Sequence, residues 1–385
     1  MNAPRISAVE TPRLRMEGIC KRFGATIALE NVNLEVRAGE VHALVGENGA
    51  GKSTLMRILS GATVPDRGSI HLDGQVFAPL HPIDARRRGI AMIYQELSLA
   101  PHLSVMENIL LGIEPNRAGF IRWNEMRRRA QEALSEIGLA DFPLEIPVRA
   151  LPSGLQQMVE IARAVVTQAK VVVLDEPTSS LAQDDVVRLF RMVRRLRDRG
   201  LTIIYISHFL EEVKQISDRF TVLRDGHSVG SGLTSETPID QMVQMMVGRE
   251  ITELYPRRTR VQGAIILEVK GLTGVDKPID VNLTLHRGEI LGIAGLIGSG
   301  RTELLRAIFG LQPVRRGQVR VGVIHGRRDP GERWHEGVGY VSEDRKREGL
   351  AVGLSVSANI TLPRLDYLGK WWFLAPRRER DVADR

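Results

Sequence analysis

The chain has 385 residues, 43% hydrophobic and 26% charged, and this length predicts two folded domains rather than one compact core. Its net charge is +7, but the basic residues are spread along the sequence, so the charge only weakly indicates a nucleic-acid or anionic-membrane partner. A single cysteine, Cys20, fits a reducing compartment, and no apolar run reaches the ~18 to 20 residues of a membrane span, so we expect a chain that does not enter a membrane.

The first strong motif lies between Glu40 and Gly61, where an apolar strand, a glycine turn and a helix are expected. Gly46 to Ser53 reads "GENGAGKS", which is the full G-x-x-x-x-G-K-[ST] pattern of a phosphate-binding loop. The glycines let backbone N–H groups surround phosphates, Lys52 reaches the β- and γ-phosphates, and Ser53 supplies a ligand for Mg²⁺. The predicted nucleotide-binding residues are Gly46, Glu47, Asn48, Gly49, Ala50, Gly51, Lys52, Ser53 and Thr54.

Polar residues lie at the ends of three further predicted strands. Gln95 follows "IAMIY", Asp175 and Glu176 end "KVVVLDEP", and His208 follows "LTIIYIS". Asp175 would hold Mg²⁺ through its water shell, and Glu176 would polarise the water that attacks the γ-phosphate. Gln95 and His208 could contact phosphate, water or metal, although such residues are more often helix caps or satisfied core groups. The predicted catalytic residues are Glu176, His208 and Gln95, and the predicted metal ligands are Ser53, Gln95 and Asp175.

The predicted domains are residues 1–249 and 265–385, joined by a linker at 250–264. Just before the linker, "PIDQMVQMMVG" has apolar residues at helical spacing, namely Ile239, Met242, Met245 and Met246. We expect these side chains to fill the core between the domains, with a flexible methionine stripe that binds a partner as the alternative.

The chain repeats itself with a period of about 250 residues. Val32 to Gly61 aligns without gaps on Val281 to Gly310, so "GLIGSGRTELL" is the second copy of "GENGAGKSTLM". Arg301 takes the place of Lys52, and its planar guanidinium is a poor replacement for a compact ammonium in a tight loop. The predicted second, degenerate loop consists of Gly295, Gly298, Gly300, Arg301 and Thr302.

In order and spacing, these motifs resemble those of the ATP-binding cassette (ABC) ATPases over residues 11–249. Gln95 matches the Q-loop, "LPSGLQQ" stands at the signature position, Ser180 to Asp184 match the D-loop, and His208 matches the switch histidine. The resemblance implies that the bound nucleotide is ATP. It also implies that Phe23, in "CKRFG", stacks on adenine, with an ordinary core phenylalanine as the alternative.

The fold implied by the resemblance is α/β: a P-loop ABC ATPase cassette with a mixed sheet core, a helical subdomain at about residues 97–168 and an N-terminal β subdomain. A partial second cassette follows. In the family a second cassette continues to its own signature, acidic strand end and switch histidine, and this sequence contains none of them. We therefore expect a C-terminally incomplete tandem protein, whether as a truncation or as a partial gene.

Two elements narrow the resemblance to the tandem ATPases of bacterial monosaccharide importers of the ribose, galactose, xylose and arabinose type. They are "GLIGSGRTELL" and "YVSEDRKREGL", Tyr340 to Leu350. The implied function is ATP hydrolysis, with ATP and Mg²⁺ as cofactors, that energises sugar import from the cytoplasmic face of the inner membrane. Membrane permease subunits are the implied partners, a periplasmic sugar-binding protein is an indirect one, and nucleic acid is not expected. The alternatives are a nonhydrolysing nucleotide-binding fragment and a soluble tandem ABC protein acting on ribosomes or DNA.

The signature departs from the family at two positions. Pro152 stands where related importers carry a serine whose hydroxyl meets the γ-phosphate of the opposite site, and Leu155 replaces a glutamine. Family geometry places two cassettes head to tail, so a second cassette or a second chain is needed to complete each ATP site. We expect the chain alone to bind ATP but to hydrolyse it slowly. The predicted signature residues are Leu151, Pro152, Ser153, Gly154, Leu155 and Gln156.

Overall fold

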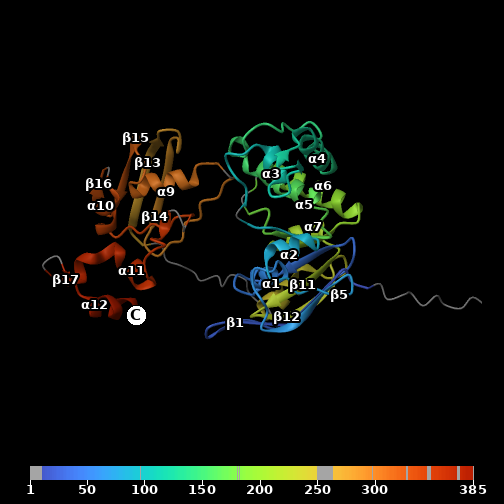
Figure 1. Cartoon of the computed structure of the whole chain (residues 1–385). Coiled ribbons are helices and arrows are strands. Elements are labelled where there is room, and N and C mark those ends of the chain that lie inside the picture. The colour runs from blue at the N-terminus through green and yellow to red at the C-terminus, as the bar shows by residue number, and fades with distance from the viewer. Residues whose placement is uncertain are drawn as a thin grey trace, which may run out of the picture. The chain divides into compact units, whose positions relative to one another are not determined.

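The computed structural model describes residues 11–95, 97–179, 181, 183–248, 263–296, 298–326, 328–344, 348–370 and 373–384. The chain divides into two compact units between Leu254 and Tyr255, and each unit is described by itself (Figure 1). The predicted linker at 250–264 lies almost wholly outside the described residues, and so do Ser180 and Ala182 of the predicted D-loop. Among the described residues, no helix is long and apolar enough to cross a membrane.

A four-stranded antiparallel sheet opens the first unit, in the order β2-β1-β4-β5. In β1 the side chains of Leu14, Met16 and Ile19 are buried, as expected of a strand with one face on a core. The strands are β1 Leu14–Phe23, β2 Thr26–Val36, β4 Arg67–Leu72 and β5 Gln75–Val76.

The second sheet has six strands in the order β12-β11-β3-β10-β9-β6, all parallel except β12. Every residue of β3 and β10 is buried, which explains their nearly unbroken apolar sequences. Because the strands are parallel, the residues that follow them, including Gly46, Glu176 and His208, emerge at the same edge of the sheet. The strands are β3 Val41–Val45, β6 Ile90–Ile93, β9 Val171–Asp175, β10 Thr202–Ser207, β11 Arg219–Arg224 and β12 His227–Leu233.

Two hydrophobic clusters cover the two faces of this sheet. Val172 and Tyr205 face a cluster formed with α3 to α6, whereas Val173 and Ile204 face α1 and the N-terminal sheet. The helices of the first unit are α1 Lys52–Leu59, α2 Pro82–Arg87, α3 Val105–Leu110, α4 Trp123–Glu136, α5 Ser153–Val166, α6 Gln183–Asp198, α7 Leu210–Ile216 and α8 Ile239–Val247. A short hairpin, β7 Asn116–Arg117 and β8 Phe120–Ile121, and the 3-10 turn η1 Val148–Ala150 complete the helical region.

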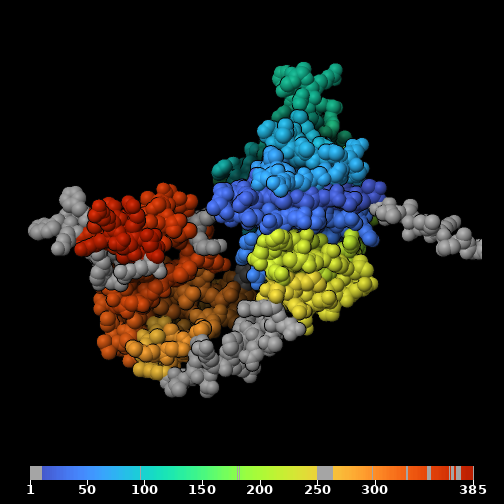
Figure 2. All heavy atoms as spheres, turned by 90° about the horizontal axis from the view of Figure 1, so that it is seen from below, coloured from blue at the N-terminus to red at the C-terminus, as the bar shows by residue number. Residues whose placement is uncertain are grey.

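Segments far apart in the sequence lie side by side in the first unit. Figure 2 shows the blue N-terminal strands against the yellow surface of residues near the end of this unit. The backbone N–H of Glu30 donates to the carbonyl oxygen of Gly226 at 2.8 Å, and that of Asn33 donates to Oγ of Ser228 at 3.1 Å. These bonds attach the N-terminal sheet to the turn and strand that close the six-stranded sheet.

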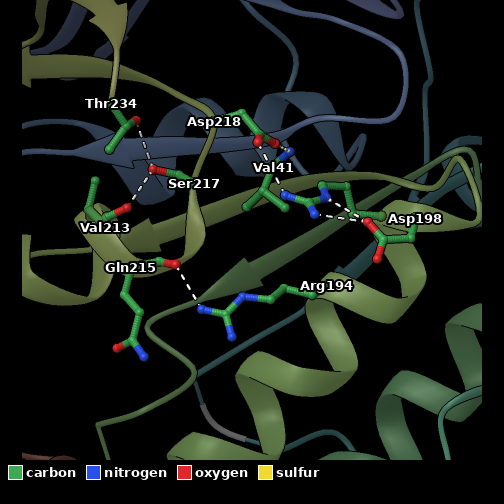
Figure 3. A network of polar contacts seen from close by, with 9 residues as sticks. Val41, Arg194, Asp198, Val213, Gln215, Ser217, Asp218 and Thr234 are labelled. Atoms are coloured by element: carbon green, nitrogen blue, oxygen red, sulfur yellow. Dashed lines mark hydrogen bonds and ion pairs between the residues drawn. The ribbon is translucent and has the colours of Figure 1, made fainter. Parts of the chain in front are cut away.

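A network of polar contacts ties α6 to β3 and to the loop before β11 (Figure 3). Asp218 accepts a hydrogen bond from the backbone N–H of Val41 at 2.8 Å and another from Arg197 at 3.2 Å. Oγ of Ser217 lies 3.0 Å from Oγ1 of Thr234. One carboxylate therefore links a core strand to the last turn of a surface helix.

The methionines of α8 lie in a different place from the one expected. Met242 and Met246 are buried in a cluster with Phe220 and Val222 of β11, so their predicted core role is confirmed. The cluster belongs to the first unit, however, and the expectation that these side chains fill the core between two domains is wrong. Burial against β11 also leaves little of these two side chains for the alternative partner-binding stripe.

The second unit is built around a four-stranded antiparallel sheet in the order β14-β13-β15-β16, packed against α9 through a small core that includes Leu272 and Leu304. Its strands are β13 Ile265–Gly274, β14 Val281–His286, β15 Val314–Val321, β16 Ile324–His325, β17 Gly369–Lys370 and β18 Phe373–Leu374. Its helices are α9 Arg301–Phe309, α10 Pro330–His335, α11 Val356–Thr361, the 3-10 helix η3 Leu362–Tyr367 and α12 Pro376–Ala383.

The repeat is incomplete at one strand. Residues 290–294 align with β3 but form no strand, and Ile290 and Leu291 are 79% and 41% exposed. In the first unit β3 is held between β10 and β11. The described residues of the second unit supply no parallel strand that could pair with 290–294 in the same way.

Candidate active site

The loop between β3 and α1 can form only because glycine stands at two of its positions. Gly51, the residue before α1, has φ 102°, and a Cβ there would lie 2.6 Å from the side chain of Leu29. A Cβ on Gly46 would lie 2.3 Å from the carbonyl oxygen of Leu223. The loop therefore approaches its neighbours more closely than any side chain permits.

Lys52 is the first residue of α1 and is only 6% exposed. Its Nζ donates to the carbonyl oxygens of Gly46 at 2.7 Å and of Glu47 at 3.0 Å. Burial lowers the pKa of Lys52, and the nearby carboxylates of Glu176 and Asp175 oppose this shift. Because its carbonyl partners are neutral, the ammonium gives the loop a positive charge that suits an anionic phosphate.

Asp175 ends β9, and Glu176 is the residue that follows. Burial raises the pKa of Asp175, the adjacent Glu176 adds to the rise, and Lys52 opposes it. Glu176 has a left-handed backbone with φ 45°, which is rare for a residue with a side chain. Its N–H donates to the carbonyl oxygen of Ile206 in β10 at 3.0 Å, which holds the turn in place.

The structure brings the three predicted catalytic residues together around one carboxylate. Nε2 of Gln95 donates to Oε2 of Glu176 at 3.4 Å, and Nδ1 of His208 lies 3.1 Å from Oε1. Gln95 and His208 are both exposed, so neither is the satisfied core group that the local pattern alone would favour. Their catalytic roles remain predictions, which their shared contact with one carboxylate supports.

Ser53 and Asp175 fit the predicted magnesium site by their chemistry. Ser53 is exposed on the first turn of α1, and Asp175 is half-buried at the end of β9. Mg²⁺ prefers oxygen ligands and is usually held by one or two carboxylates together with phosphate and water. Burial and the adjacent Glu176 raise the pKa of Asp175, so its charged form is disfavoured in the chain alone, and a bound divalent cation would favour that form.

The signature residues lie where α5 begins. Pro152 precedes the first residue of α5, Ser153, and no side chain caps this helix start. Gly154 is buried, and a Cβ there would lie 2.6 Å from Cγ of Asp185. Nε2 of Gln156 donates to the carbonyl oxygen of Leu151 at 2.8 Å. The start of α5 therefore has no side-chain cap, and the first backbone N–H groups of any helix lack partners within it.

Phe23 is 50% exposed at the end of β1, with Nζ of Lys21 5.6 Å from its ring centroid. This exposure removes the alternative of an ordinary core phenylalanine. Adenine stacking remains a prediction, and a half-exposed ring face is what such stacking needs.

The second loop begins a helix in the same way as the first. Gly300 has φ 97° and precedes Arg301, the first residue of α9, which is exposed. Oγ1 of Thr302 donates to Oε2 of Glu343 at 3.1 Å, and Nζ of Lys277 donates to the carbonyl oxygen of Gly298. Sequence reasoning missed Lys277, whose ammonium reaches this loop from the turn between β13 and β14, because nothing local indicates that contact.

Sequence reasoning also missed a clamp on the segment that follows Gln95. The N–H of Ser98 donates to Oε1 of Glu160 at 2.6 Å, and Nη1 of Arg163 donates to the carbonyl oxygen of Ser98 at 3.1 Å. Burial raises the pKa of Glu160. Two charged residues three apart within the otherwise apolar "MVEIARAVV" of α5 were the signal that could have indicated this clamp.

We expect Asp175→Asn to remove the stabilisation by Mg-ATP without lowering the stability of the ligand-free chain at pH 8. A carboxyl whose folded-state pKa is raised contributes stability at low pH, and this contribution is lost as the pH rises through the folded pKa. Asparagine does not ionise, so the stability of the variant relative to that of wild type should be greatest at high pH. Thermal unfolding from pH 5 to 8, with and without Mg-ATP, checks this. Exposed Asp141→Asn is the control, and a loss of stability that grows with pH would contradict the prediction.

Both units match known proteins. The sequence model of the ABC transporter family matches residues 29–179 and 279–382. RbsA 2 of Rubrobacter xylanophilus, a ribose import ATP-binding protein, is 46% identical over 379 residues, 98% of this chain and 73% of the relative. The ribose import ATP-binding protein RbsA of Geobacillus kaustophilus is 44% identical over 374 residues, 96% of this chain and 75% of the relative. The ADP conformation of MJ1267, an ATP-binding cassette of an ABC transporter, is 27% identical, with TM-score 0.54, over 62% of this chain and 100% of that one.

Proposed function

Because the chain belongs to the ABC transporter family, we propose that it is the ATP-hydrolysing subunit that energises import of a monosaccharide through a membrane permease. The observation that carries the proposal is the convergence of Gln95 and His208 on the carboxylate of Glu176. The names of its relatives, which are ribose import ATP-binding proteins, supply the transport class. They do not favour the alternative of a soluble tandem ABC protein that acts on ribosomes or DNA.

The proposed reaction uses the chain's own residues for binding and for moving a proton. The loop from Gly46 to Thr54 surrounds the phosphates of ATP, and Lys52 pairs with their charge. Glu176 accepts a proton from the attacking water, while Gln95 and His208 orient the carboxylate and the γ-phosphate. Ser53, Gln95 and Asp175 would hold Mg²⁺, which would neutralise charge on the phosphates.

The permease is proposed to contact the segment that follows Gln95, at about residues 95–109, from the cytoplasmic face of the membrane. The clamp of Glu160 and Arg163 on Ser98 supports this, because it joins that segment rigidly to α5, the signature helix. A periplasmic sugar-binding protein would act through the permease. No residue described here is proposed to touch the sugar.

A second cassette or a second chain is proposed to complete the ATP site with its own signature. The support is the position of the signature residues. Leu151 to Gln156 lie at the start of α5 in the helical region, whereas Lys52 lies on α1 and Glu176 follows β9. If two first units pair, Pro152 weakens the substitute signature, since removal of one donor aimed at the γ-phosphate costs ~10² to 10³ in rate.

Reconstitution tests both proposals. The chain, its permease and a sugar-loaded binding protein are combined in liposomes, and ATP hydrolysis and sugar uptake are measured together. The proposal predicts hydrolysis that rises with the loaded binding protein and uptake that requires ATP. If two chains share a site, the rate of hydrolysis per chain, measured without the permease, should rise with the concentration of the chain. A high rate per chain that does not depend on the concentration of the chain would exclude the shared site. Hydrolysis that is never accompanied by sugar uptake would exclude the import function.

A further inference from the structure

Glu212, on the first turn of α7, is the acceptor at the centre of a small polar cluster. Its Oε2 accepts hydrogen bonds from the phenol of Tyr205 at 2.8 Å, from Oγ1 of Thr178 at 2.9 Å and from Oγ of Ser207 at 3.2 Å. All three donors are buried. A carboxylate oxygen with three hydroxyl donors makes strong, charge-assisted bonds that fix the position of each donor.

The donors come from the two segments that carry catalytic side chains. Thr178 is two residues beyond Glu176, and Ser207 directly precedes His208. Oγ of Ser207 also accepts a hydrogen bond from the N–H of Phe209 at 3.0 Å, so the peptide that follows His208 is held. A single carboxylate therefore joins the turn after β9 to the turn after β10.

Tyr205 anchors the cluster to the sheet. It is fully buried in the middle of β10, and burial, followed by the charge of Glu212, raises the pKa of its phenol. The phenol therefore remains protonated and continues to donate to Glu212. The cluster is thus attached to a strand that has no exposed residue.

We infer that Glu212 is a positioning residue for ATP hydrolysis, because its carboxylate fixes the separation between Glu176 and His208. It touches neither side chain through any of these bonds and acts through Thr178 and Ser207. Phosphoryl transfer depends on groups held close to the productive geometry, so a change in this separation slows turnover more than it weakens binding. The inference rests on the proposed hydrolysis at Glu176.

The chain offers a matched control on the same helical turn. Glu211 is exposed and differs from Glu212 by one position, so Glu211→Gln removes the same charge without touching the cluster. In Glu212→Gln the amide keeps the size of the side chain but replaces a charged acceptor by a neutral one.

Steady-state hydrolysis of Mg-ATP by the purified full chain tests the inference, with thermal unfolding of each variant measured alongside. For Glu212→Gln we expect kcat to fall about tenfold or more while KM for Mg-ATP stays within about twofold of wild type, and Glu211→Gln should match wild type. A kcat equal to that of Glu211→Gln would overturn the inference. So would a fall in kcat that the unfolded fraction at the assay temperature accounts for in full.

A double-mutant cycle covers the case in which Glu212→Gln does not fold. Thr178→Val and Ser207→Ala each release one segment from the carboxylate, and a true bridge predicts that the double variant loses less kcat than the product of the single losses. Independent, multiplicative losses would overturn the bridge. A wild-type chain that binds Mg-ATP but shows no hydrolysis at any concentration would instead overturn the proposed function.

Discussion

Glu176→Gln is expected to keep the affinity for Mg-ATP and to lower hydrolysis by at least ~100-fold, the lower end of what a general base contributes. Glutamine has nearly the same shape, so the contacts to Gln95 and His208 can persist as amide hydrogen bonds. What is lost is the negative charge that takes the proton from water. The predicted nucleotide contacts belong to the loop that Lys52 closes between β3 and α1, so binding should change little.

The measurement for Glu176→Gln combines equilibrium binding of ATP with single-turnover hydrolysis, which separates binding from chemistry. Glu211→Gln serves again as the control for loss of a carboxylate outside the site. Hydrolysis by the Glu176 variant at a rate comparable to wild type would show that another group is the base. A parallel loss of binding would show instead that the substitution damages the loop.

Lys52→Ala should weaken binding of Mg-ATP about ten- to a hundredfold, because a hydrogen bond to a charged group is worth ~1.5 to 3 kcal/mol. Lys52 is buried at the loop, whereas the aligned Arg301 is exposed on the second loop. Arg301→Ala should therefore lose much less affinity. Calorimetric titration of the two variants with Mg-ATP shows which of them loses more affinity. A larger loss for Arg301→Ala would mean that the two sites have been assigned in the wrong order.

The sequence was sufficient for features that depend on local pattern. The ABC fold class is confirmed by the family match and the solved structures, and "GENGAGKS" spans the loop between β3 and α1 and the first two residues of α1, as expected. Strand ends were predictable because runs such as "KVVVLDEP" are buried and stop at charged residues. A parallel sheet then places those ends together, which is why Gln95, Glu176 and His208 meet.

Features that depend on contacts across the chain could not be predicted in this way. The bridge at Glu212 joins Thr178 to Ser207 through side chains from three elements, and no spacing in the sequence marks it. Similarly, the periodicity of α8 indicated a buried face but not that β11 would cover it. The absence of a strand at 290–294 has the same cause, since an apolar segment becomes a strand only where another strand can pair with it.

The left-handed backbone at Glu176 makes the predicted catalytic base a residue that costs folding free energy. Such a conformation costs ~1 to 3 kcal/mol for a residue with a side chain, and glycine would adopt it without that cost. The conformation persists because β10 holds the N–H of Glu176 through Ile206. Selection for a more stable chain would therefore favour glycine at this position, whereas the proposed hydrolysis requires a carboxylate there.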